Sequence, residues 1–421
     1  MHAMSQAYQD AKNKMQIFRG GCCMEQGNHV PGGAVRVASA TMVCVMTQLT
    51  RRDFLKTASA TALASAVVPG FAAGRRQRVF IASSAPNGIL AFDWNSATGD
   101  LSSAGVAAAV PKVAWLAFSH HKEYMYSASE LDMFEGKPTG EVASFRVRNG
   151  AIKQISARNS AGVGTCQVAV DHTGRMLVSV DYVGGSAASF RIANGELSEI
   201  VWTERYTYHG PNKDRQQTAH AHYASFSPDN RFAYINDLGG DCIHIYKADP
   251  ATAGMTPAGT YHGAPGCGCR TLHFHPNGHT AYCMNEMAST VDVLEWHKAD
   301  GSLTLVTRID LLPADYHGPT RGCDTVITRD GRFVYFANRD DNFLYTFTAD
   351  ARTGSLTPVR RSNCGGKTPR NFVLDPTERW MLVANQDSNL LSVFARDPVT
   401  GALADQCKSF PAEAPMRILF T

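Results

Sequence analysis

Histidine, arginine and glutamate side chains occur at matching points of several similar segments in this 421-residue chain. The set comprises His222, Arg270, Glu286 and Arg339, with Arg370 at a further matching point. An imidazole or a carboxylate can accept a proton from water, and a guanidinium can stabilise an oxyanion or hold a phosphate or carboxylate. If the fold gathers these groups into one concave site, they suit a small anionic substrate.

The segments that carry these residues are copies of one phrase, in which a strand enters a tight turn and a second strand leaves it. The phrase occurs as FSHHKEYMYSAS, VDHTGRMLVSVD, FSPDNRFAYIND, FHPNGHTAYCMN, ITRDGRFVYFAN and LDPTERWMLVAN. Its turn positions are separated by 52, 56, 48, 53 and 47 residues, and they are Lys122, Gly174, Asn230, Gly278, Gly331 and Glu378. Such a period with all-β repeats is typical of a propeller, in which each repeat is one four-stranded blade.

The two ends of the chain supply the missing repeat. Residues 75–421, divided by a repeat of about fifty residues, predict seven blades. The segment from Arg78, RVFIASSAPNGILAFDWNSATGDL, matches only the later part of a unit, and the C-terminal APMRILF matches the beginning of one. We therefore predict an all-β, seven-bladed β-propeller of four-stranded blades whose C-terminal strand completes the first blade and closes the ring. A pair of open sandwiches, the competing architecture, gives no reason for this split.

Residues at the same phase of each repeat are expected at the same place in successive blades. The innermost strands open with Ala114, Cys166, His222, Arg270, Cys323, Arg370 and Met416. The second strands end with Glu130, Tyr182, Leu238, Glu286, Arg339 and Gln386. Because these strands are antiparallel, both sets reach the same face of the disc, which places Glu286 near Arg270 and within reach of His222, Arg339 and Arg370. The plainer alternative is a set of solvated rim residues or surface ion pairs.

The chain resembles the lactonase family of seven-bladed propellers, which includes the bacterial propeller-type 6-phosphogluconolactonases and the fungal carboxy-cis,cis-muconate cyclase. The resembling stretches are RQQTAHAHYASFSPDNRFAYINDLGGDCIHIY at 215–246, RTLHFHPNGHTAYCMNEMASTVDVL at 270–294, DGRFVYFANR at 330–339 and GGKTPRNFVLDPTERWMLVANQDSNLLSVFARDPVTGAL at 365–403. The family site uses the second His of His-Ala-His, the Arg that opens the next blade, the Glu of Asn-Glu and the Arg of Asn-Arg. The resemblance assigns these roles to His222, Arg270, Glu286 and Arg339.

The resemblance implies a lactonase that hydrolyses a small anionic sugar lactone through attack of an activated water on the lactone carbonyl. His222 or Glu286 would activate the water, and Arg270 would stabilise the oxyanion. The remaining expected substrate contacts are Arg339, Arg370 and His220. Two alternatives remain open: a cyclase of the muconate type would use the same residues for ring closure, and a non-catalytic propeller would bind a protein or glycan.

No metal and no other cofactor is expected from the sequence. Soft ligand types are present, but they show no standard zinc spacing; they are His220, His222, Cys267, Cys269 and Cys323. Eight of the eleven cysteines follow residue 74, and this even number permits disulfides in an oxidising compartment without requiring them.

Residues 1–74 are expected to form an N-terminal extension and a twin-arginine signal peptide. Residues 50–56, TRRDFLK, carry the arginine pair, and the Ala-rich run that follows is too short and too weakly apolar for a membrane span. The protein is therefore expected in the periplasm or outside the cell. The extension holds seven of the 40 Lys/Arg and three of the 37 Asp/Glu, so the remainder holds 33 and 34, which leaves no basic footprint for nucleic acid. No sequence pattern specifies an oligomeric state.

Overall fold

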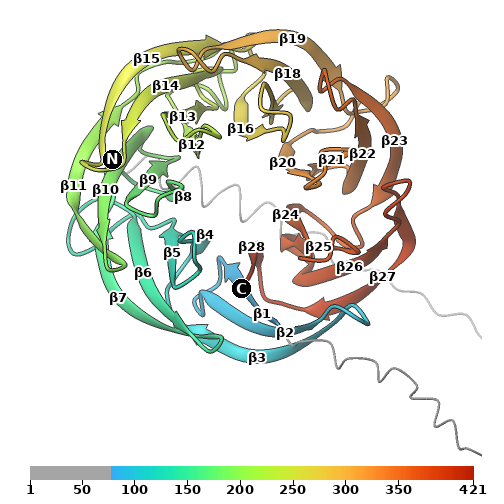
Figure 1. Cartoon of the computed structure of the whole chain (residues 1–421), viewed down its shortest axis with the longest axis horizontal. Helices are drawn as coiled ribbons and strands as arrows, with labels where there is room; N and C mark the ends of the chain where they lie inside the picture. Colours follow the sequence, from blue (N-terminus) through green and yellow to red (C-terminus); the bar gives the residue numbers. More distant parts are fainter. Residues whose placement is uncertain (1–76) are drawn as a thin grey trace, which may run out of the picture. The chain divides into compact units, whose positions relative to one another are not determined.

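The computed structural model describes residues 77–421, which form seven four-stranded antiparallel sheets arranged in a ring (Figure 1). The predicted all-β fold and the number of blades are confirmed. The expected extension and signal peptide lie outside the described residues. Within residues 77–421 the one helical element is a 3-10 turn, η1 (Gln386–Ser388), and no helix there is long and apolar enough to cross a membrane.

The first blade combines the two ends of the propeller. It consists of β28 (Pro415–Phe420), β1 (Gln77–Ser83), β2 (Ile89–Asn95) and β3 (Asp100–Ala108), in that order across the sheet. β28 pairs antiparallel with β1, with Phe420 opposite Val79 and Ile418 opposite Ile81. The C-terminal strand therefore closes the ring as predicted, and the backbone groups of β1 that face β28 are paired.

The other six blades follow in chain order. The second and third are β4 (Val113–Phe118), β5 (Tyr124–Ser129), β6 (Glu141–Arg148), β7 (Ala151–Asn159) and β8 (Thr165–Val170), β9 (Met176–Asp181), β10 (Ser186–Ala193), β11 (Glu196–Arg205). The fourth and fifth are β12 (Ala221–Phe226), β13 (Phe232–Asp237), β14 (Cys242–Asp249), β15 (Gly254–His262) and β16 (Cys269–Phe274), β17 (Thr280–Asn285), β18 (Thr290–Trp296), β19 (Leu303–Asp310). The sixth and seventh are β20 (Gly322–Ile327), β21 (Phe333–Asn338), β22 (Phe343–Ala349), β23 (Leu356–Asn363) and β24 (Pro369–Leu374), β25 (Trp380–Asn385), β26 (Leu390–Arg396), β27 (Leu403–Pro411).

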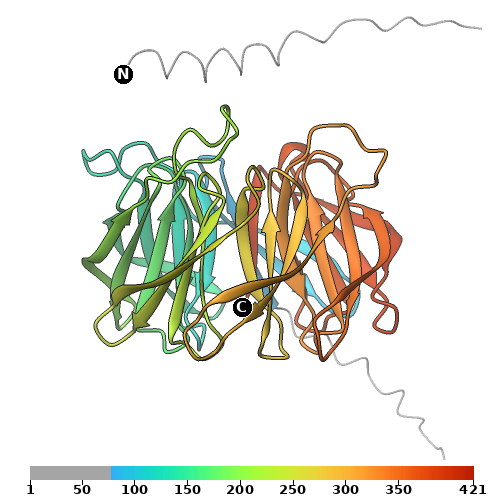
Figure 2. The ribbon, with the colours of Figure 1, turned by 90° about the horizontal axis from the view of Figure 1, so that it is seen from above.

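The first strand of each sheet lies nearest the centre of the ring, and the fourth lies at its circumference (Figure 1). Seen from the side, the blades stand next to one another with their strands running between the two faces of the disc (Figure 2). The second and third strands are almost wholly buried, and β9, β13, β17 and β21 expose none of their residues. The apolar core is thus made between neighbouring blades, which holds the inner strands at fixed positions.

Neighbouring blades are joined by a repeated contact between a tyrosine and a glycine turn. Three hydroxyls donate to glycine carbonyls of the following blade, Tyr234 to Gly301 at 2.8 Å, Tyr282 to Gly354 at 2.7 Å and Tyr335 to Gly401 at 2.6 Å. Gly354 has φ +69°, and a Cβ there would lie 2.4 Å from Cγ2 of Thr280 in the preceding blade. Glycine is therefore needed at these turns both for the left-handed backbone and for the close approach of the next blade.

In all seven blades the innermost strand contains one extra residue near its start. The register shifts leave this residue without a partner on the second strand, at Ala114, Cys166, His222, Arg270, Cys323 with Asp324, Arg370 and Met416. A β-bulge of this kind bends the strand and re-aims the side chain at the bulge. Alignment of the repeats within the sequence identifies the same positions, and the bulge explains why they form one ring of side chains.

Candidate active site

Glu286 follows the last residue of β17 and is the centre of a cluster of three guanidinium groups. Its Oε2 accepts a hydrogen bond from Nε of Arg270 at 2.9 Å and lies 2.6 Å from Nη2 of Arg339. Its Oε1 accepts from Nη2 of Arg215 at 2.7 Å. The structure therefore brings Glu286, Arg270 and Arg339 into direct contact, as the repeat phase predicts.

The carboxylate of Glu286 is ionised and firmly held. Burial by itself raises its pKa, but the charges of Arg339 and Arg270 outweigh this effect and keep the pKa well below 4.5. Both of its oxygens face guanidinium groups, and its side chain is only 3% exposed. A carboxylate in this state is a weak base and a strong positioning group.

The two inner arginines differ in how many donors they retain. Arg270 donates from Nε to Glu286 and from Nη1 to the carbonyl of Cys323 in the next blade, which uses two of its five N–H groups. Arg339 Nη2 is close to Glu286 but poorly aligned for a hydrogen bond, so neither its Nε nor its Nη2 has a hydrogen-bond partner within residues 77–421. Burial lowers the pKa of Arg339 to about 10, although Glu286 opposes this shift. Arg339 thus remains charged at neutral pH with free donors.

His222 is a neutral imidazole beside this cluster. Burial and the charge of Arg270 lower its pKa well below 6.5, and the opposing charge of Glu286 does not compensate. Nδ1 of His222 has no hydrogen-bond partner in the described part of the chain. The ring packs edge-on against Tyr182, with centroids 5.6 Å apart. His222 is therefore unprotonated at neutral pH and has a nitrogen able to accept a proton.

His220 and Tyr182 support the cluster from the third and fourth blades. Their rings stack with centroids 4.5 Å apart, and Nδ1 of His220 lies 2.8 Å from the carbonyl oxygen of Tyr182. That distance makes Nδ1 the protonated nitrogen, since a carbonyl can only accept, and leaves Nε2 as the acceptor. The hydroxyl of Tyr182 accepts a hydrogen bond from Arg215 at 3.1 Å. His220 thus holds Tyr182, which in turn helps to hold Arg215.

Arg370 pairs with a carboxylate other than Glu286. Its Nη2 is 3.9 Å from Oε1 of Glu130, which follows the last residue of β5 in the second blade. Arg370 is nevertheless close enough for its charge to lower the pKa of both His222 and Arg339. The structure therefore places Arg370 on the same face as the cluster, paired with Glu130 rather than with Glu286.

Arg215 is a site residue that alignment of the repeats did not identify. It lies in residues 206–220, between β11 and β12, which is the longest connection between two blades in the described structure. Gln216 anchors this connection, because its buried Nε2 donates to the carbonyl of Leu238 at 2.9 Å and to Oδ1 of Asp241 at 2.6 Å. Repeat phase could not locate Arg215, since the equivalent connections between the other blades are shorter. Its unusual length was the available signal.

The fold and this cluster define a class of protein: a closed seven-bladed propeller with a cluster of arginines around one buried glutamate on one face. The chain matches the family model described as Lactonase, 7-bladed beta-propeller, over residues 78–420. It is 30% identical over 298 residues to the 6-phosphogluconolactonase of Bacillus subtilis (strain 168), covering 70% of this chain and 83% of that enzyme. The protein therefore belongs to the lactonase family of seven-bladed propellers.

Solved structures agree with this assignment. The Pseudomonas aeruginosa periplasmic gluconolactonase superposes with a TM-score of 0.76 at 28% identity, covering 82% of this chain and 98% of the other. A protein of Bacteroides fragilis NCTC 9343, described as a putative 6-phosphogluconolactonase, gives 0.76 at 26% identity, with the same two coverages. The resemblance stated from the residues is thereby confirmed at the level of the family.

Proposed function

We propose that this protein is an exported lactonase that hydrolyses a small anionic sugar lactone, in the manner of the 6-phosphogluconolactonases to which it is similar. The observation that carries the proposal is the charge balance of the site. Three guanidinium groups contact one carboxylate, and two nitrogens of Arg339, Nε and Nη2, have no hydrogen-bond partner within residues 77–421. A phosphate or carboxylate on the substrate supplies the missing negative charge and the acceptors.

In the proposed reaction His222 is the base. Its ring is neutral and its Nδ1 has no hydrogen-bond partner within residues 77–421, whereas both oxygens of Glu286 already contact guanidinium groups. The water oxygen attacks the lactone carbonyl carbon as His222 takes the proton, and the carbonyl electrons move onto oxygen. The oxyanion then collapses, the ring C–O bond breaks, and the leaving ring oxygen takes the proton back from His222 as an alcohol.

In this proposal the arginines stabilise the oxyanion and bind the substrate. Arg270, fixed by Glu286 and by the Cys323 carbonyl, stabilises the oxyanion with its remaining donors. Arg339 holds the anionic substituent of the lactone, and Arg370 adds positive charge from across the site. His220 contacts the substrate through Nε2, because its Nδ1 faces the carbonyl of Tyr182.

The experiment that tests this function is base consumption at constant pH with a panel of lactones. We expect 6-phosphogluconolactone to be hydrolysed with a higher kcat/KM than uncharged gluconolactone, and His222→Asn to lower kcat by about a hundredfold. His279→Asn, in an exposed turn, is the matched control and should retain full activity. Hydrolysis of charged and uncharged lactones at equal rates, or full activity of His222→Asn, would contradict the proposal.

The same panel separates the alternative reactions. A muconate-type cyclase would close the ring of a carboxymuconate faster than it opens a sugar lactone, and a binding propeller would leave every lactone intact. Both outcomes would refute hydrolysis as the function while leaving the fold assignment unchanged.

Export is a separate part of the proposal. It is supported by the arginine pair at Arg51 and Arg52 and by the similarity to a gluconolactonase described as periplasmic. Replacing both arginines by lysine should retain the protein in the cytoplasm, as measured by cell fractionation. Unchanged periplasmic recovery would show that this motif does not direct export.

A further inference from the structure

A second group of chemically reactive side chains gathers at the β13–β14 hairpin of the fourth blade. Asp237 ends β13 and faces Cys242, the first residue of β14, as its direct partner across the hairpin. Cys242 and His244 are two residues apart on β14, so their side chains leave the same face of the strand. The register of one hairpin therefore brings a carboxylate, a thiol and an imidazole to one point.

The distances among these groups suit the coordination of one metal ion. Nε2 of His244 lies 3.5 Å from Sγ of Cys242 and 3.7 Å from Oδ2 of Asp237, and all three atoms lie within 4.8 Å of one another. Ligand atoms about 2.0–2.3 Å from one tetrahedral zinc ion are separated by about 3.3–3.7 Å. A proton relay would need the two ring nitrogens to face different partners, but here one nitrogen faces both the thiol and the carboxylate.

The two carboxylate oxygens of Asp237 differ in their hydrogen bonding. Oδ1 accepts hydrogen bonds from the backbone N–H of His220 at 2.7 Å and of Gly240 at 3.1 Å. Oδ2 is fully buried and has no hydrogen-bond partner among the described residues. An unpaired buried carboxylate oxygen is costly, so its position next to two other ligand atoms requires an explanation.

The ligand atoms are also held in place by their surroundings. The ring of His244 stacks on Tyr206 with centroids 4.1 Å apart and planes 8° apart. The two backbone N–H groups fix the carboxylate of Asp237 through Oδ1 and leave Oδ2 directed at the thiol and the imidazole. Such outer contacts orient ligands in metal sites.

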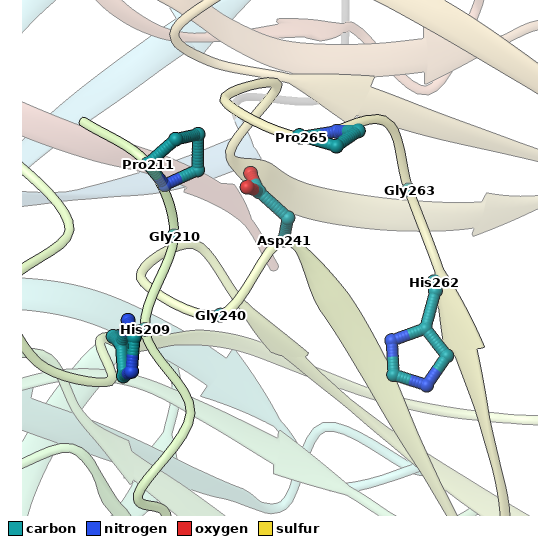
Figure 3. A pocket seen from close by; sticks show the side chains of 8 residues that line it. All are labelled: His209, Gly210, Pro211, Gly240, Asp241, His262, Gly263 and Pro265. Atoms are coloured by element: carbon teal, nitrogen blue, oxygen red, sulfur yellow. The ribbon is translucent and has the colours of Figure 1, made fainter.

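A cavity lies beside the hairpin that carries these side chains. Its volume is about 430 Å³, and it lies between His209 and Pro211 on one wall and His262 and Pro265 on the other (Figure 3). Gly240 lines the cavity, and a Cβ at this position would lie 2.7 Å from Oδ2 of Asp237. The glycine therefore separates the buried carboxylate from the cavity without covering it with a side chain.

We propose that Asp237, Cys242 and His244 bind one zinc ion through Oδ2, Sγ and Nε2, with a water molecule as the fourth ligand. Nitrogen, thiolate and carboxylate are the ligand types that zinc prefers, and zinc takes them in a tetrahedral arrangement. The thiol of Cys242 releases its proton to solvent as the metal–sulfur bond forms. Sequence spacing did not predict a metal because these residues come together through hairpin register, outside any standard zinc pattern.

The bound ion would also steady the proposed active site. Tyr206, which stacks on His244, is the first residue of the connection that carries Arg215. Asp237 further holds the backbone of His220. The zinc ion would thus brace the segment from which Arg215 reaches Glu286.

The test is direct metal binding, which does not depend on lactonase activity. The reduced full chain is incubated with zinc, freed of excess by gel filtration and analysed by elemental mass spectrometry. Wild type should retain about one zinc per chain more than Cys242→Ser and His244→Gln. Cys364→Ser, which alters a buried thiol of another blade, should match wild type.

Cobalt substitution of the wild type provides a second readout that does not require a variant to fold. Cobalt bound here should give thiolate-to-metal charge-transfer absorption, and zinc should displace it. Absence of that absorption, or equal zinc content in wild type and in folded Cys242→Ser and His244→Gln, would overturn the proposal. So would loss of zinc in Cys267→Ser but not in Cys242→Ser, since the sulfurs of Cys267 and Cys269 lie 3.8 Å apart nearby.

Discussion

Replacing Glu286 by Gln removes the carboxylate that Arg215, Arg270 and Arg339 share, while keeping the shape of the side chain. Glu286, Arg270 and Arg339 are each no more than 5% exposed at the side chain, so solvent does little to screen the guanidinium charges left behind. Removing one partner of a buried ion pair costs about 3–5 kcal/mol. At about 2 °C per kcal/mol for a domain of this size, Tm should fall by about 6–10 °C.

The same substitution should change the pH dependence of stability. The lowered pKa of Glu286 means that its contribution is present above pH 4.5 and is lost as pH falls toward the folded-state pKa. Glu286→Gln lacks this group, so the difference in Tm between wild type and variant should shrink as the pH is lowered below 4.5. Turnover at neutral pH should fall by about a hundredfold, because the arginines lose their common anchor.

Thermal melting and lactone hydrolysis, measured on the same preparations, test these expectations. Asp330→Asn is the matched control, because Asp330 pairs with Arg332 and the two side chains are 46% and 55% exposed. Loss of such a pair costs about 1 kcal/mol or less. A Glu286→Gln variant with the Tm and the kcat of the control would refute the view that this carboxylate organises the site.

Three further predictions concern other parts of the molecule. Arg370→Gln should move the acid limb of the kcat–pH profile to higher pH, because burial and the neighbouring guanidiniums, Arg370 among them, lower the pKa of His222; an unmoved limb would exclude His222 as the base. Arg215→Gln should lower kcat/KM for a phosphorylated lactone by about tenfold through loss of a charged hydrogen bond, and an unchanged value would remove it from the site. Gly354→Ala should lower Tm more than Gly278→Ala, since both have positive φ but only Gly354 would meet another blade; equal effects in thermal melts would contradict the packing account.

The architecture could be predicted because a propeller has two signs in the sequence. Similar segments recur about every fifty residues, and one repeat is divided between the two ends of the propeller. The turn positions fixed the blades, and the match of the C-terminal APMRILF to a blade opening fixed the closure between β28 and β1. Repeat phase likewise placed Arg270, Glu286 and Arg339 on one face, because equivalent positions of a ring must meet around its centre.

Other features depend on information that a repeat does not contain. Arg215 comes from a connection unique to one pair of blades, and its contact with Glu286 follows from how Gln216 anchors that connection. The β-bulges that re-aim His222 and its equivalents occur in every blade, so they do not change the length of the sequence repeat and cannot be detected from it. The approach of Asp237 to Cys242 could have been found by pairing residues across the predicted hairpin, a step finer than blade assignment.

The most direct test of the central claim is a crystal structure of the protein with 6-phosphogluconate, the product of the proposed reaction. The account predicts the phosphate within hydrogen-bond distance of Nε or Nη2 of Arg339 and the carboxylate of the product near His222 and Arg270. Product bound elsewhere on the propeller, with the cluster around Glu286 empty, would contradict it.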